Sequence, residues 1–131
     1  MNHRTLDLIV HPSGEVVLIN EGNEPELHVL QRAVGGFIEN IPEYYLWEGA
    51  VVKHMAKFRI TESGEIVEGG ITRIYCNEES KLPLYQFLEQ NETEKYQEYI
   101  KENLNPLSYI LEPHDFLLGR LVVQMVVKID D

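Results

Sequence analysis

Residues 51–60 read Val-Val-Lys-His-Met-Ala-Lys-Phe-Arg-Ile and alternate with a period of two. Such alternation is typical of a strand, because successive side chains point to opposite faces. One predicted face carries Val52, His54, Ala56, Phe58 and Ile60, and the other carries Val51, Lys53, Met55, Lys57 and Arg59. Glu62-Ser63-Gly64-Glu65 has the composition of a turn, and residues 71–76 are expected to belong to the return strand. The pattern predicts a long hairpin over residues 50–76, with a bulge at Gly69-Gly70.

Further strands are expected on both sides of this hairpin. Residues 5–10 and 15–19 are rich in β-branched and aliphatic side chains, and His11-Pro12-Ser13-Gly14 supplies a turn between them. Residues 37–41 are expected to form one more short strand, and residues 119–129 are apolar enough for a buried strand. The sheet is therefore expected to have about five to six strands and two hairpins.

A short helix is expected after the first hairpin. Leu27, Leu30 and Val34 recur at helical spacing, and Pro25 suits the first turn of such a helix. Gly35 is expected to end it in the left-handed conformation that glycine adopts without steric cost.

One or two helices are expected before the last strand. Residues 83–103 carry apolar side chains at helical spacing, with Thr93 as the expected N-cap of the second helix and Asn105-Pro106 as its end. The predicted fold class is α+β, an antiparallel sheet with the helices on one face. At 131 residues and 15.2 kDa, the chain is expected to form a single domain over residues 1–131. One core is predicted, with contributions from Leu27, Leu30, Val34, Ile38, Phe58, Ile71, Ile74, Leu121, Val123 and Val127.

The charge balance is strongly acidic. Eleven Lys and Arg face 22 Asp and Glu, a formal net charge of −11. Direct binding to nucleic acid requires a basic footprint, so it is not expected. No apolar run has the length of a membrane span, the N-terminus lacks a signal-peptide core, and one cysteine excludes an internal disulfide. These features predict a cytoplasmic protein without membrane contact.

Motifs for the common chemistries are absent. The five histidines show no spacing typical of a metal site, the serines lack a nucleophile-elbow context, and there is no phosphate-loop or dinucleotide fingerprint. We therefore expect a protein that is not an enzyme, with no catalytic residue, no metal and no cofactor.

A group of basic residues stands out against this acidic background. Lys53, Lys57 and Arg59 lie in a stretch without acids, and Arg73 lies on the expected partner strand. Cross-strand pairs with Glu62, Glu65 and Glu68 offer one interpretation, in which the patch is neutralised. The other interpretation is an anion site for the phosphates of a nucleotide, with Arg59 and Arg73 favoured because a planar guanidinium binds phosphate through two hydrogen bonds. Tyr45, Trp47 or Phe58 would then stack on the base, Asn77 would read its edge, and Arg120 would add a further cation. Asn77 also fits a capping or turn residue.

Three motifs together resemble a known family. They are Leu30-Gln31-x-x-Val34-Gly35-Gly36-x-Ile38-Glu39, Cys76-Asn77-Glu78-Glu79-x-Lys81-Leu82 and Asp115-x-x-x-Gly119-x-x-Val122-Val123. Their order is similar to that of a small domain family of unknown function, found mainly in phages, plasmids and other bacterial mobile elements. The resemblance covers residues 5–127 and implies a fold and a genomic setting. It implies no activity, so no catalytic residues are carried over.

Two functions of different classes follow. The first is a non-enzymatic anti-defence protein of a phage or mobile element, a homo-oligomer that sequesters a small nucleotide immune signal of the cyclic nucleotide or cyclic ADP-ribose type. It would act in the cytoplasm of the bacterial host. The alternative is an acidic DNA mimic that inhibits a host nuclease, restriction or CRISPR enzyme. A structural or regulatory subunit without a ligand is a third possibility.

Overall fold

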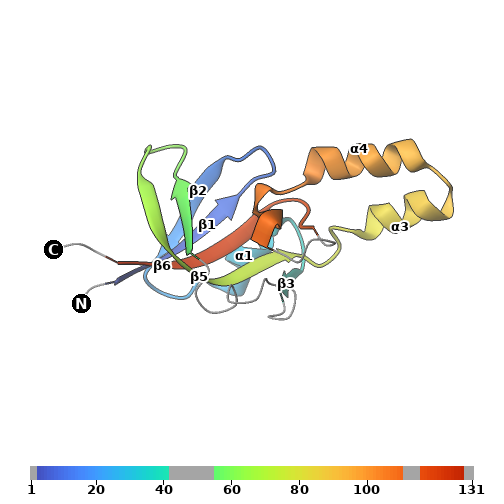
Figure 1. Cartoon of the computed structure of the whole chain (residues 1–131). Coiled ribbons are helices and arrows are strands. Elements are labelled where there is room, and N and C mark those ends of the chain that lie inside the picture. Colours follow the sequence, from blue (N-terminus) through green and yellow to red (C-terminus); the bar gives the residue numbers. More distant parts are fainter. Residues whose placement is uncertain (1–2, 42–54, 111–115, 129–131) are drawn as a thin grey trace.

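The fold is an antiparallel sheet with helices, which confirms the predicted α+β class (Figure 1). The computed structural model describes residues 3–41, 55–110 and 116–128. In these segments the strands are β1 (His3–Val10), β2 (Val16–Glu21), β3 (Ile38–Asn40), β4 (Met55–Arg59), β5 (Ile66–Asn77) and β6 (Leu121–Lys128). The helices are α1 (Leu27–Val34), α3 (Leu82–Glu89) and α4 (Thr93–Asn103), with a 3₁₀ helix η2 (Pro106–Ile110).

The six strands are ordered β2-β1-β6-β5-β3, and β4 also pairs with β5. Strand β5 is long enough to pair with β6 along one edge and with β4 and then β3 along the other. The sheet curls so that β4 approaches β2, the strand at the other edge. Thr61, just after β4, is hydrogen-bonded to Val16 at the start of β2. Thr61 N donates to the Val16 carbonyl (2.9 Å), and Val16 N donates to Thr61 Oγ1 (3.0 Å).

The apolar side chains form two clusters on opposite faces of the sheet, not the single core predicted. The larger cluster fills the inside of the curl and includes Ile71, Ile74, Leu121, Val123 and Val127, with Phe58 partly buried against it. The smaller one joins Leu30, Ala33 and Val34 of α1 to Tyr75 and Val122, with Ile38 at its margin. The prediction was wrong for Leu27, which is 58% exposed at the start of α1.

The helices occur where the sequence predicts them along the chain, with α1 after the first hairpin and α3 and α4 before the last strand, but they do not all lie on one face of the sheet. Helix α1 covers one face of the sheet, whereas α3 and α4 project beyond the end of the sheet as an antiparallel pair (Figure 1). The rings of Phe87 and Tyr99 join the pair edge to face, with centroids 6.1 Å apart. We call residues 82–103 the arm. None of the described helices is both long and apolar enough for a membrane span.

Several local predictions are confirmed or corrected. Gly35 ends α1 with φ +83°, as predicted, and its N–H donates to the Gln31 carbonyl. Pro25 precedes α1 by two residues instead of lying in its first turn. Thr93 is the first residue of α4, after Glu92 in the N-cap position, so it is not the N-cap. The β5 bulge is at Thr72 and not at Gly69-Gly70, because the register against β6 shifts between Ile71 and Arg73.

Candidate functional site

The residues predicted to bind a ligand lie in several places. Tyr45, Trp47 and Lys53 are outside the described residues. Lys57, Phe58 and Arg59 lie on β4, Arg73 and Asn77 on β5, and Arg120 just before β6. The structure does not bring the two favoured arginines together. Arg59 pairs with Ile66, and Arg73 follows Ile66 by seven residues on β5.

The β4 residues line a hollow of about 300 Å³, here called the β4 hollow. Its described lining comes from β1, β2, β4, η2 and the first turn: Val10, Gly14, Val16, Lys57, Phe58, Arg59, Pro106 and Leu107. Lys57 and Arg59 are the charged members of that lining, which contains no acid. On β4, Phe58 turns toward the core while its two neighbours, Lys57 and Arg59, stay exposed.

Direct ion pairs do not neutralise these two cations within the described part of the chain. Lys57 faces Glu68 across the strand pair without an ion pair to it. Glu65 instead pairs with Arg4 on β1, at 3.0 Å. The Lys57 and Arg59 side chains are therefore available to an anion, with Glu68 as a nearby opposing charge.

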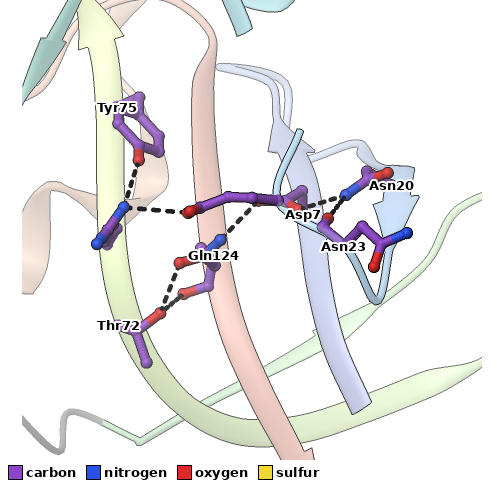
Figure 2. A network of polar contacts seen from close by, with 8 residues as sticks. Asp7, Asn20, Asn23, Thr72, Tyr75 and Gln124 are labelled. Carbon is purple, nitrogen blue, oxygen red and sulfur yellow. Dashed lines mark hydrogen bonds and ion pairs between the residues drawn. The ribbon is translucent and has the colours of Figure 1, made fainter. Parts of the chain in front are cut away.

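Arg73 contacts Tyr75, on the face of the sheet that α1 partly covers. A row of polar side chains that includes Tyr75, Gln124 and Asp7 lies there (Figure 2). The Nη1 of Arg73 donates to Glu24 Oε1 (3.1 Å) and to the Tyr75 hydroxyl (3.3 Å). Glu24 comes from the loop between β2 and α1. An anionic ligand at Arg73 would thus have to displace a carboxylate that the chain already supplies.

The same row contains Asp7, a buried carboxyl group that sequence reasoning missed (Figure 2). Asp7 is 0% exposed and accepts hydrogen bonds from Asn20 Nδ2 (3.0 Å) and Gln124 Nε2 (3.4 Å). Burial raises the pKa of Asp7 above its ordinary value, and the two donors oppose that shift. The signal in the sequence was a single charge inside the apolar strand Leu6-Asp7-Leu8.

Asn77 uses its side-chain amide within the fold. Its Nδ2 donates to the Val34 carbonyl (3.3 Å) at the end of α1, and its Oδ1 accepts from Glu79 N (2.9 Å). This geometry supports the capping and turn interpretation. Arg120 is exposed and lines a separate hollow of about 270 Å³, together with Arg32 and apolar residues of β1, β2 and α1.

A third hollow, of about 250 Å³, lies where the arm joins the sheet and is called the arm-root hollow. Its described lining is Glu39, Ile41, Cys76, Asn77, Glu78, Ser80, Lys81, Leu82, Tyr85, Phe116, Leu117 and Leu118. Burial raises the pKa of the Cys76 thiol to about 11, so the thiol stays protonated and poorly nucleophilic at neutral pH.

No cluster of three or more metal-ligating side chains occurs within residues 3–41, 55–110 and 116–128. Comparisons with family models, curated proteins and solved structures find no match for this chain. The resemblance to mobile-element proteins stays a prediction.

Proposed function

We propose that this protein binds a small phosphorylated nucleotide in the β4 hollow and sequesters it without chemical change. One observation supports this proposal above the others. In a chain with a net charge of −11, the described lining of this hollow contains no acid and has two cations side by side on one strand, whereas the cations of the Arg120 hollow come from separate segments. A positively charged site in an acidic protein favours an anionic ligand.

The two cations differ in what they offer to a phosphate. Arg59 presents a planar guanidinium that binds two phosphate oxygens at once, and Lys57 adds a point charge. The two side chains extend from positions separated by one residue, so a single phosphate or two linked phosphates can reach both.

The rest of the hollow suits the apolar part of a nucleotide. Phe58 is partly buried against the core, and the buried side chains of Val10, Val16 and Leu107 form the base of the hollow beside it. An apolar surface with a few charged groups is the usual composition of a small-molecule site. The volume of about 300 Å³ is at the lower end for such sites and is compatible with a mononucleotide-sized group.

The biological setting of this proposal comes from the sequence resemblance. A phage or mobile-element protein that holds a cyclic nucleotide or cyclic ADP-ribose derivative would withhold that signal from the immune system of its bacterial host. Sequestration requires binding and slow release, with no turnover. The protein would act in the host cytoplasm, as a homo-oligomer.

Two measurements test this function. Heat-denatured protein is analysed by mass spectrometry for released small molecules, and calorimetry follows binding of cyclic nucleotides and ADP-ribose derivatives. Arg59→Ala is expected to weaken binding about 10- to 150-fold, the equivalent of one charge-assisted hydrogen bond. Lys101→Ala removes an exposed cation from α4 and is expected to change nothing. Absence of any binding, together with absence of a co-purified nucleotide, would contradict the proposal.

The second candidate function is an acidic mimic of DNA that inhibits a nuclease, restriction or CRISPR enzyme. The arm favours it, because residues 82–103 project from the sheet and contain five glutamates and two lysines (Figure 1). Inhibition by charge mimicry is expected to weaken steeply as salt rises. Nuclease assays at low and high salt, with and without the protein, test this candidate.

A further inference from the structure

The arm carries apolar side chains that the rest of the described structure leaves uncovered. Leu82, Tyr85 and Leu88 of α3 are 49%, 59% and 57% exposed. Their spacing of three residues places neighbours on one side of the helix, so they form a stripe. Scattered exposed apolar residues are normal on protein surfaces, but a contiguous group is typical of an interaction site.

The stripe continues into the arm-root hollow. Leu82 and Tyr85 line that hollow on the side of α3. The apolar lining on the side of the sheet comes from Ile41, Leu117 and Leu118. An apolar side chain placed in the hollow would therefore touch α3 and the body of the protein together. Anchors of this kind, buried at the centre of an interface, contribute most of the affinity of protein complexes.

The surroundings of the stripe are negative. Glu39 and Glu78 line the hollow, and the arm has five glutamates against two lysines. One of those lysines, Lys95, pairs with Glu92 at 3.0 Å. Lys81, the cation in the described lining, lies over the Phe116 ring at 4.8 Å from its centroid, so the lining carries two acids and one base. A partner must therefore combine apolar side chains with positive charge.

We propose that the stripe and the arm-root hollow form a docking surface for a basic amphipathic segment of a partner protein. Its apolar side chains enter the hollow and pack on Tyr85 and Leu88, and its Lys or Arg residues face Glu39 and Glu78. A second copy of this chain fits poorly, because a twofold contact through the stripe would place two acidic arms together. The described linings of this surface and of the β4 hollow have no residue in common, so the inference does not rest on nucleotide binding.

A synthetic helical peptide provides the probe. The patterned peptide has Leu at positions i, i+3, i+4 and i+7 and Lys at most others, and it carries a fluorescent label for anisotropy titration. One control has the same composition with its leucines spread around the helix. A second control has Glu in place of Lys. The patterned peptide is expected to bind at least tenfold more tightly than either control.

Matched variants locate the binding. Tyr85→Ser is expected to weaken binding of the patterned peptide about 30-fold, the loss typical of a central interface anchor. Glu78→Gln is expected to weaken binding and to reduce its salt dependence. Leu27→Ser changes an apolar residue of equal exposure on α1 and is expected to leave binding unchanged. Circular dichroism checks that each variant is folded.

Three results would overturn the inference. Equal binding of the patterned and spread peptides, or no binding of either, would show that the stripe does not bind the apolar face of a helix. Unchanged binding in Tyr85→Ser would locate the peptide elsewhere. Sedimentation of a dimer that Tyr85→Ser converts to a monomer would show that a second copy covers the stripe.

Discussion

Gly69 of β5 lies against the carbonyl group of Val126 on β6 so closely that a Cβ atom would overlap its oxygen and come within 2.9 Å of its carbon. Both neighbours of β5 pair with it at this point, since Gly69 is opposite Ala56 on β4 and Val127 on β6. The obstacle is backbone, which cannot rotate away. Gly69 therefore allows close approach of strands in the curled sheet, a role different from the bulge that the sequence predicted.

Gly69→Ala is expected to lower the free energy of unfolding by about 3 kcal/mol, because β5 and β6 must separate to admit the methyl group. Gly70→Ala is the matched control. A Cβ at Gly70 meets only Met55 Sδ, at 4.0 Å, and the expected loss is below about 1 kcal/mol. Urea denaturation of both variants measures the difference, and equal losses would contradict this account of Gly69.

Leu30→Ala is expected to cost about 2 to 5 kcal/mol of stability, because Leu30 is buried between α1 and the sheet. Leu27→Ala, three residues earlier on the same helix, is expected to cost less than about 0.5 kcal/mol because Leu27 is exposed. Thermal and urea unfolding compare the two variants. Similar losses would mean that α1 is rotated relative to the packing described.

The strands and α1 were predictable because each has a local pattern. The period-two alternation around Phe58, the helical spacing of Leu30 and Val34, and the glycine at position 35 each identify an element without reference to the rest of the chain. The division of the core was not predictable in this way. Val122 and Val123 are neighbours on one strand and therefore face opposite sides of the sheet, but no local pattern says what packs against each side.

The candidate sites depend on strand register and on contacts between distant segments. Arg59 and Arg73 are on adjacent strands, but the turn after Ile60 places Ile66 opposite Arg59, and Arg73 lies beyond the described end of β4. The contacts of Asp7 come from β1, β2 and β6, and the β1–β6 pairing joins the two ends of the chain. No local pattern in the sequence predicts the pairing of β1 with β6.

The stability of the protein is expected to depend on pH through the titration of Asp7. Its pKa in the folded protein is raised above the ordinary 3.8, so the folded state binds this proton more tightly than the unfolded chain does. The resulting stabilisation is fully present below pH 3.8 and is lost as pH rises through the raised pKa. Asp7→Asn removes the titration.

Urea denaturation of wild type and Asp7→Asn across this pH range measures the effect. Wild type is expected to gain stability relative to Asp7→Asn as pH falls from the raised pKa to 3.8. Glu62→Gln removes the charge of an exposed acid and is the matched control for the substitution itself. A constant difference between wild type and Asp7→Asn at all pH values would contradict the assignment.

The chain is expected to form a homo-oligomer through the segment that contains Trp47, which lies outside the described residues. Exposed aromatic side chains are common anchors of subunit contacts, and this expectation comes from the sequence alone. Light scattering is expected to give a mass above the 15.2 kDa of one chain at micromolar concentrations. Trp47→Ala is expected to lower that mass, and a wild-type mass of one chain would reject the prediction.

The two arginines favoured from the sequence are expected to respond differently to ligand, because only one is already paired. Arg73 is held by Glu24 and the Tyr75 hydroxyl, whereas Arg59 forms no ion pair within the described residues. We expect Arg59→Ala to weaken nucleotide binding about 10- to 150-fold. Arg73→Ala and Glu24→Gln are expected to leave it unchanged in calorimetry. If Glu24→Gln instead strengthened binding and Arg73→Ala abolished it, the ligand would compete with Glu24 for Arg73, and the site would be the polar row on the α1 face of the sheet.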